Sequence, residues 1–149
     1  MIAYIDTSAL LRIVSREPGA LDDLRSCEAL VSSELIGVEC ARTVDRLRLQ
    51  GSLTADEAAA RLRIVTDWLE AIDLVLLRPS VLSRASEPMP MAIGTLDAVH
   101  LATALIWRDR MGPLQALATP ERLRMATRNS VCVAGNCHSL ARECLIAHG

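Results

Sequence analysis

The sequence predicts an α/β fold in which a central, mainly parallel sheet is flanked by helices. Short apolar runs that suit strands alternate with longer segments whose apolar residues recur at helical spacing. Helix caps and glycine or proline breaks separate the two kinds of segment. Strands joined through helices run parallel, and helices cover both faces of such a sheet. The chain has 149 residues, of which 51% are hydrophobic, so we expect one domain over residues 1–149.

The first third of the chain predicts two strands that each lead into a helix. Residues 2–5 form an apolar strand, and Asp6, Thr7 and Ser8 are favoured caps for a helix over 9–14. Glu17, Pro18 and Gly19 then interrupt the pattern. The elements expected next are a short helix at 21–26, a strand at 29–32, and a long helix that Ser33 caps and that runs to about Gln50 before a stop at Gly51.

The rest of the chain continues the alternation. Thr54 and Glu57 form a capping box, and Thr95 is the expected cap of a strongly apolar helix. The expected elements are a helix after Thr54, a strand at 74–77, a brief helix from Pro79, a helix from 95 to about 107, a strand at 114–118, a helix near Pro120, a strand at 131–133 and a terminal helix.

The net charge and the hydropathy of the chain argue against a DNA-coating protein and against a membrane-spanning protein. A net charge of −2 gives no global basic field, so any contact with a nucleic acid must be local and must use arginine, because all the basic residues are arginines. The start of the chain has no basic leader, and no apolar stretch reaches the length of a membrane span. We therefore expect a cytoplasmic protein that does not enter the membrane.

Five cysteines is an odd number, and their spacing does not form the paired C-x-x-C pattern of a zinc site. Buried, reduced thiols are the favoured interpretation. The tail offers a possible metal-binding cluster, although its apolar spacing equally fits a strand and a helix. The residues of this cluster are Cys132, Cys137, His138, Cys144 and His148.

Three acidic residues interrupt segments that are otherwise apolar. Asp6 ends the first strand, Glu39 lies in LIGVECA, and Asp97 lies in GTLDAVHLATAL. An unpaired buried carboxylate costs several kcal/mol, so each residue needs a reason to be there. Each has a structural explanation: Asp6 caps a helix, Asp97 lies at the positive end of a helix, and Glu39 pairs with Arg42 or Arg46.

Together the three carboxylates point to a site for a hard cation. Several carboxylate oxygens are what Mg²⁺ or Mn²⁺ requires, and such an ion can activate water for phosphodiester cleavage. In a parallel sheet the ligand lies beyond the carboxyl ends of the strands, where Asp6 is expected. We expect His100, one helical turn after Asp97, to pack or to make a hydrogen bond and not to catalyse.

Three segments, IDTSALL, SSELIGVECAR and GTLDAVHLATAL, resemble in order and spacing the signature segments of PIN domains, especially those of VapC-type toxins. This resemblance implies a PIN-like domain whose metal ligands are Asp6, Glu39 and Asp97. It also implies that Thr7 or Ser8 supports the site through a hydroxyl or backbone contact.

PIN domains usually carry a fourth acid shortly after the fourth strand, in a segment that resembles T-x-D-x-x-L. The corresponding stretch here is ALATPERLRMA. Alignment on Thr119 puts Glu121 at the position of the acid, whereas alignment on Leu123 puts Pro120 there and removes the ligand. Both alignments remain open, so Glu121 is a conditional fourth ligand.

The resemblance implies a metal-dependent endoribonuclease toxin that cleaves RNA, whether tRNA, rRNA or mRNA, by metal-activated water. It also implies a cognate VapB-type antitoxin and a homodimer. The alternative is a PIN-fold protein that has lost catalysis and acts as a binding or regulatory partner. A receiver domain of the response-regulator type also begins with acids at strand ends, but its site needs a lysine and this chain has none.

Overall fold

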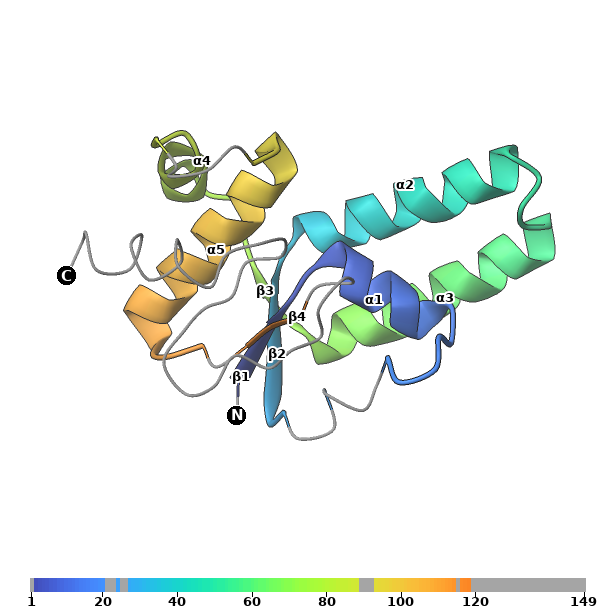
Figure 1. Cartoon of the computed structure of the whole chain (residues 1–149), viewed down its shortest axis with the longest axis horizontal. Coiled ribbons are helices and arrows are strands. Elements are labelled where there is room, and N and C mark those ends of the chain that lie inside the picture. Colours follow the sequence, from blue (N-terminus) through green and yellow to red (C-terminus); the bar gives the residue numbers. More distant parts are fainter. Residues whose placement is uncertain (1, 21–23, 25–26, 89–92, 115, 119–149) are drawn as a thin grey trace.

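The structure is a computed structural model, which describes residues 2–20, 24, 27–88, 93–114 and 116–118. It confirms an α/β fold with a parallel sheet flanked by helices (Figure 1). The elements in chain order are β1 (Ile2–Ile5), α1 (Thr7–Val14), β2 (Ala29–Ser33), α2 (Leu35–Leu49), α3 (Ala55–Ala71), β3 (Asp73–Val75), α4 (Pro79–Ala85), α5 (Thr95–Met111) and β4 (Ala116–Ala118).

The four strands lie in the order β3-β2-β1-β4, and each neighbouring pair is parallel. The register places Tyr4 of β1 between Val31 of β2 and Leu117 of β4. The carboxyl ends of these strands therefore lie at one edge of the sheet, and this is the edge at which α1 and α2 begin.

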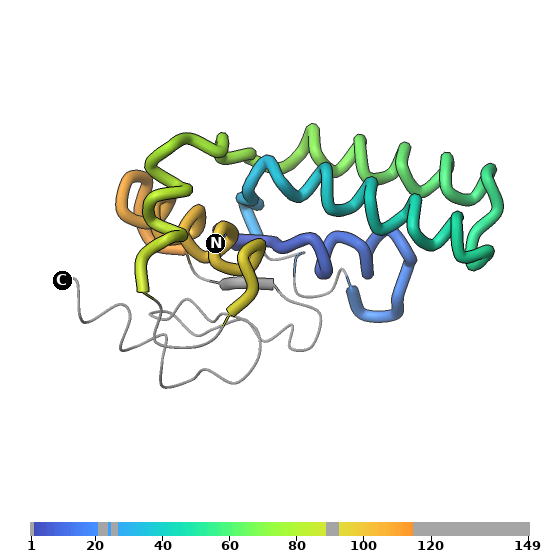
Figure 2. The backbone as a smooth tube through the Cα atoms, turned by 90° about the horizontal axis from the view of Figure 1, so that it is seen from above, coloured from blue at the N-terminus to red at the C-terminus, as the bar shows by residue number. Residues whose placement is uncertain are grey.

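The alternation of side chains along β1 divides the core into two layers. Ala3 and Ile5 are fully buried against α1, α2 and α3, whereas Tyr4 between them is buried on the opposite face with Val31 and Ala104 of α5. Figures 1 and 2 agree on this arrangement, with α1 to α3 on one side of the sheet and α5, covered by α4, on the other. Tyr4 thus faces a different helix from its immediate neighbours.

Helices α2 and α3 form a long antiparallel hairpin that extends beyond the sheet (Figure 1). Gly51 turns the chain with a φ of 75°, as expected for the glycine that ends a helix. The predicted capping box is confirmed, because the Thr54 hydroxyl accepts from the Glu57 N–H and the Glu57 carboxylate accepts from the Thr54 N–H. A small cluster of Val44, Leu53 and Ala58 packs between the two helices.

Two predicted helix caps are wrong by one residue. Ser33 is the last residue of β2 and Glu34 is the N-cap of α2, although the Ser33 Oγ still accepts a bond of 3.3 Å from the Leu35 N–H. Gly94 is the N-cap of α5, which makes Thr95 the first helical residue. The predicted end near residue 107 is also too early, because the charged residues 108–110 continue α5 to Met111 without adding to its apolar pattern.

Two predicted strands are shorter than expected because their partners are short. Strand β3 covers Asp73–Val75 and not 74–77, since it pairs with residues 31–33 and β2 ends where α2 begins. Strand β4 covers Ala116–Ala118 and not 114–118, and it pairs with residues 3–5. The predicted helix at 21–26 falls mainly outside the described residues, as do all the elements expected after residue 118. Within the described ranges, no helix combines the length and the apolar character that crossing a bilayer requires.

Candidate active site

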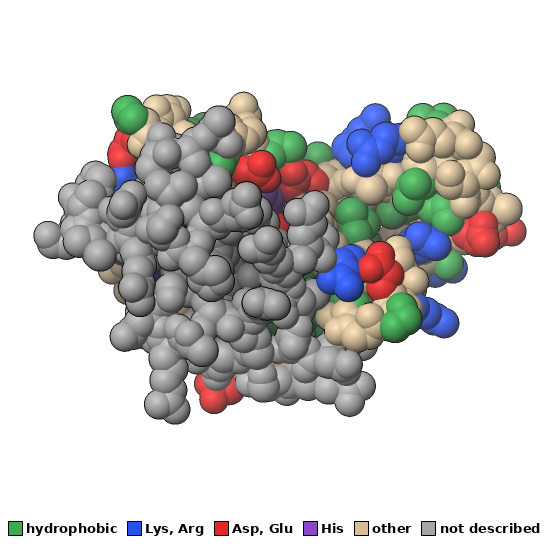
Figure 3. All heavy atoms as spheres, viewed as in Figure 1, with side chains coloured by type: hydrophobic (Ala, Val, Ile, Leu, Met, Phe, Trp, Pro, Cys, Tyr) green, Lys and Arg blue, Asp and Glu red, His purple; other side chains and the backbone are tan. Residues whose placement is uncertain are grey.

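The acidic residues come from elements that meet at the carboxyl edge of the sheet. Asp6 follows β1 directly, Glu39 lies in the second turn of α2, and Asp97 is the third residue of α5. Figure 3 shows acidic side chains gathered near the start of α2 and of α5, with a histidine behind them. In open parallel sheets this edge is where ligands bind.

Asp6 is held in place by the helix that it caps. Its Oδ1 accepts a bond of 2.9 Å from the Ala9 N–H and one of 2.6 Å from the Ser8 hydroxyl. Burial raises the pKa of Asp6, and the bonds from Ser8 and Ala9 oppose that rise. Neither of these two bonds uses Oδ2, and the Ser8 backbone N–H also interacts with the carboxylate and lowers the pKa of Asp6. Capping therefore fixes the side chain and leaves one oxygen available to a ligand.

Glu39 is also bonded through one oxygen. Its Oε2 accepts from the Thr7 hydroxyl and lies 2.8 Å from Nε2 of His100. Burial alone would raise the pKa of Glu39, but the bonds from His100 and Thr7 outweigh it and the pKa is lowered. The carboxylate form is thus favoured. The second oxygen, Oε1, accepts no hydrogen bond from any described residue.

The predicted pairing of Glu39 with an arginine of its own helix is not found. Arg42 forms an ion pair of 3.2 Å with Asp45, and Arg48 binds the same carboxylate at 2.7 Å. Across the described ranges, Arg46 has no ion pair. The polar environment of Glu39 therefore comes from α1 and α5 and not from α2.

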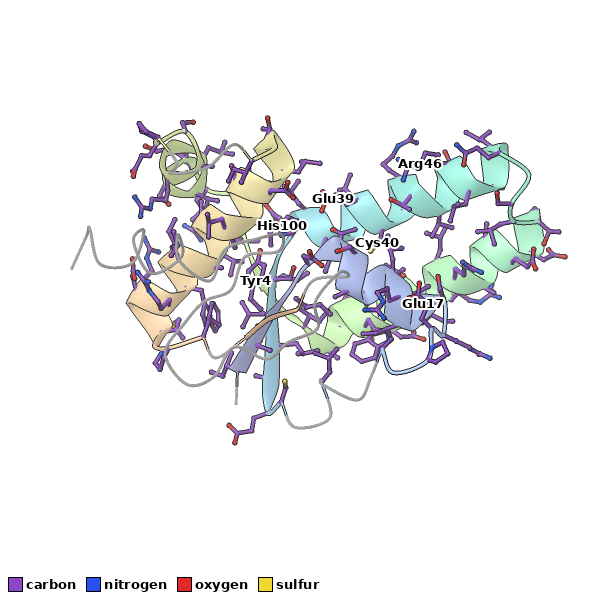
Figure 4. The ribbon with its side chains drawn as sticks, viewed as in Figure 1. Tyr4, Glu17, Glu39, Cys40, Arg46 and His100 are labelled. Carbon is purple, nitrogen blue, oxygen red and sulfur yellow. The ribbon has the colours of Figure 1, made fainter. Side chains whose placement is uncertain are left out.

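His100 connects Glu39 to the core, as Figure 4 shows. It is 7% exposed, and its Nδ1 lies 2.8 Å from the hydroxyl of Tyr4. The Tyr4 oxygen also accepts a bond of 3.1 Å from the Ser33 N–H. This confirms that His100 makes buried hydrogen bonds. The contribution of Tyr4 was missed, and the signal for it was a tyrosine in an apolar strand, because a buried hydroxyl needs a partner.

Asp97 differs from the other two acids because it is exposed. The apolar segment that it precedes is buried from Ala98 to Leu105, but the first turn of α5 is exposed and the adjacent Leu96 is 50% exposed. The Asp97 Oδ2 lies 3.3 Å from the position that a Cβ on Gly94 would take, so the carboxylate lies close to the N-terminus of the helix. Spacing of three residues puts Asp97 on the same side of α5 as His100.

The donors fit a hard cation, although the three acids do not form a compact group. Asp6 Oδ2 and Glu39 Oε1 are carboxylate oxygens, the type of ligand that Mg²⁺ and Mn²⁺ prefer. Among the described residues, no three His, Cys, Asp or Glu side chains lie close enough together to hold a metal ion.

Glu121 and the cysteine and histidine cluster of the tail lie outside the described residues. Cys40, beside Glu39 in sequence, is fully buried and is not in a disulfide. Burial raises the pKa of Cys40 to about 12, and the nearby charges of Glu39 and Asp6 add to the rise. This thiol is therefore a core group and not a ligand or nucleophile.

Comparisons with known proteins identify the family of this chain. The profile of the PIN domain family matches residues 3–107, a segment that contains Asp6, Glu39 and Asp97. Ribonuclease VapC46 of Mycobacterium tuberculosis is 36% identical over 104 residues, which cover 68% of this chain and 72% of the relative. The segment that the family profile matches runs from β1 into α5 and includes the residues that hydrogen-bond to Asp6 or Glu39 in the described part of the chain.

Proposed function

Because the chain belongs to the PIN-domain family, we propose that it is a metal-dependent endoribonuclease of the VapC type, the toxin of a toxin and antitoxin pair. The observation that carries this proposal is the pair of carboxylates at the carboxyl edge of the sheet, each held through one oxygen and open at the other. The name of the M. tuberculosis relative, a ribonuclease, supports RNA as the substrate.

Asp6 and Glu39 would hold Mg²⁺ or Mn²⁺ through Oδ2 and Oε1, and Asp97 would join them as the third ligand on binding, because the three carboxylates do not yet form a compact group among the described residues. The bound cation would activate water and offset the negative charge that develops on the phosphate during hydrolysis. Thr7 would support Glu39 through its hydroxyl, and Ser8 would support Asp6 through its hydroxyl and its backbone N–H. Glu121 remains a conditional fourth ligand.

Arg46 is the residue that we expect to contact the RNA backbone. It follows Glu39 by seven residues, which places it two turns along the same side of α2, at about 10 Å along the helix axis (Figure 4). Its side chain is exposed, and in the described part of the chain it has no acidic partner. A free guanidinium is well suited to binding a phosphate. Arg46 would thus hold the strand whose phosphodiester lies at Glu39.

The same proposal includes a cognate VapB-type antitoxin, a homodimer and a cytoplasmic location. Antitoxin binding has a simple chemical basis, because an arginine supplied by a partner can pair bidentately with the carboxylates of the site. The RNA would be a tRNA, an rRNA or an mRNA, cut in a single-stranded or loop region whose bases are accessible. Growth arrest on expression, relieved by co-expression of the antitoxin, is the expected outcome in cells.

The test uses Asp97→Asn with Asp56→Asn as its control. Asp56 is also an exposed acid in the first turn of a helix, so the two variants lose similar interactions with a helix N-terminus, about 0.3–1 kcal/mol each. Asp97→Asn should stay folded and lose most Mg²⁺-dependent cleavage of total RNA, together with cation binding. Asp56→Asn should retain both.

Wild-type cleavage by a folded Asp97→Asn variant would show that Asp97 is only a helix-terminus residue. Cleavage that survives exhaustive chelation would overturn the metal mechanism. A wild-type chain that binds its antitoxin but cuts no RNA in either Mg²⁺ or Mn²⁺ would favour the alternative, a binding protein without catalysis. That alternative draws on the absence of a compact metal-binding group among the described residues.

A further inference from the structure

Three side chains from three elements form one continuous chain of hydrogen bonds that ends at the proposed metal site. The Tyr4 hydroxyl on β1 lies 2.8 Å from Nδ1 of His100 on α5, and Nε2 of His100 lies 2.8 Å from Oε2 of Glu39 on α2. Tyr4 is fully buried, His100 is nearly so, and the side chain of Glu39 is 18% exposed. The hydrogen bonds therefore lead from the buried Tyr4 to the partly exposed Glu39, and Figure 4 shows the three labelled side chains in this order.

The outer end of this chain fixes which imidazole nitrogen carries a proton. An ionised carboxylate can only accept hydrogen bonds, so His100 must donate from Nε2 to Glu39. Thr7 donates to the same oxygen, Oε2, from the opposite helix α1. Two donors on Oε2 hold the carboxylate in one orientation and leave Oε1 as the oxygen that is open to a cation.

The inner end of the chain fixes the other nitrogen. Neutral imidazole with a proton on Nε2 has an acceptor at Nδ1, and the Tyr4 hydroxyl is the donor that faces it. The Tyr4 oxygen in turn accepts from the main-chain N–H of Ser33, the last residue of β2. Hydrogen-bond donation therefore runs in one direction, from the Ser33 N–H to Tyr4, from Tyr4 to His100 and from His100 to Glu39.

We propose that His100 is a positioning residue for Glu39 and that Tyr4 sets the tautomer of His100. The hydrogen bonds from Tyr4 through His100 to Glu39 thereby make Glu39 Oε1 available to the cation. The inference rests on the proposed function, since it concerns the same metal site. Removal of a group that hydrogen-bonds to a metal ligand commonly weakens metal binding by about 10–100-fold. A role in stability alone would leave that affinity unchanged.

Two substitutions of His100 separate the two ends of the chain. The amide nitrogen of glutamine can take the place of Nε2, so His100→Gln keeps a donor to Glu39 and loses the bond to Tyr4. Asparagine is shorter, so His100→Asn can reach Tyr4 but not Glu39. Val99→Ala is the control, because Val99 is a buried residue of α5 that packs with Val81 and Ala102 and takes no part in these hydrogen bonds.

Titration of the full chain with Mn²⁺ alone, by calorimetry, measures the effect without RNA or cleavage. We expect His100→Asn to weaken Mn²⁺ binding by about 10–100-fold, and His100→Gln to lie within a few-fold of the wild type. Val99→Ala should melt at a lower temperature yet bind Mn²⁺ with unchanged affinity. A folded His100→Asn variant with wild-type affinity would overturn the proposal, and so would equal losses in His100→Asn and His100→Gln.

A second measurement tests the tautomer in the metal-free protein and does not depend on nuclease function. The ¹⁵N shifts of His100, assigned by their loss in His100→Gln, should show a protonated Nε2 and an unprotonated Nδ1. A tautomer with its proton on Nδ1 and none on Nε2 would overturn this direction of donation.

If His100→Asn does not fold, Tyr4→Phe provides the test. Mn²⁺ binding should weaken by about tenfold, at the low end of the range for groups behind a ligand, and the ¹⁵N pattern should lose its single tautomer. No change in either measurement would overturn the proposal. A wild-type chain that shows the predicted tautomer but binds no Mn²⁺ would instead overturn the proposed function and, with it, the role of this chain of hydrogen bonds.

Discussion

Asp6 has two roles that a pair of substitutions can separate, since one of its oxygens caps α1 and the other is open to a cation. Asn caps a helix about as well as Asp, whereas Ala removes a cap that is worth about 1 kcal/mol, within a range of 0.5–2. In a chain of this length, 1 kcal/mol corresponds to about 2–4 °C in melting temperature. In the presence of chelator, Asp6→Ala should therefore melt about 2–4 °C below Asp6→Asn.

The charge of Asp6 makes the stability of the folded protein depend on pH. Burial raises the pKa of Asp6 in the folded chain above its ordinary value of 3.8. Below that value the side chain is protonated in both states and contributes nothing. As the pH rises toward the folded pKa, the unfolded state ionises more readily and the wild type loses stability, and the loss is complete above the folded pKa. Asp6→Asn lacks this penalty, so its stability relative to the wild type should rise through this window and then stay constant.

Thermal melts at pH 3, 5 and 7, with chelator and with Mg²⁺, check both roles. With Mg²⁺ at 100 times its Kd, the wild type should gain about 2.7 kcal/mol, and Asp6→Asn should gain much less. Equal melting temperatures for Asp6→Asn and Asp6→Ala would refute the capping argument. An Asp6→Asn variant that is less stable than the wild type at pH 7 in chelator would refute the argument from burial.

Arg46→Gln should raise the KM for RNA several-fold at unchanged kcat and reduce the salt dependence of binding by about one ion, because it removes one phosphate contact. Arg63→Gln, at an exposed arginine of α3, should change neither, and identical behaviour of the two variants would exclude Arg46 as the contact. The Cys40 thiol has a pKa of about 12, so only about one thiol in ten thousand is ionised at pH 8 in the folded protein. Cys40 should therefore resist iodoacetamide at pH 8 until urea unfolds the protein. Peptide mass mapping measures this labelling, and labelling of Cys40 in the native protein would show that α2 and the core around it open readily.

The features that could be predicted from the sequence depend on neighbours within one helical turn. The strand at 2–5, the cap at Asp6 and the capping box of Thr54 and Glu57 are all local, and the structure has each of them. The strand ends depend on distant partners, so they could not be predicted in the same way. Strand β3 stops at Val75 because β2 stops at Ser33, which no pattern within residues 73–77 encodes.

The site shows the same division. Parallel strands bring Asp6 and Glu39 to one edge of the sheet, and this follows from topology alone. Asp97 lies at the exposed start of α5 while Ala98 to Leu105 are buried, and no pattern within the apolar segment marks where burial begins. The bond between Tyr4 and His100 could not be predicted from either segment, because it depends on which face of the sheet Tyr4 occupies and which helix covers that face.

The 96 positions that separate Tyr4 from His100 have a consequence for the order of folding. The contacts of α1 with α2, and of α2 with α3, are closer in sequence, and contacts between distant positions carry a larger loop-closure cost and slow folding. A chain that has folded only as far as α3 would already have Asp6 and Glu39 at the same edge of the sheet. Glu39 would then accept a hydrogen bond from Thr7 but would still lack the one from His100. Docking of α5 thus completes the site. A transient opening of α5 would undo it while the layer of α1, α2 and α3 stays folded, so the local stability of one helix sets the fraction of molecules in which Glu39 is fully positioned.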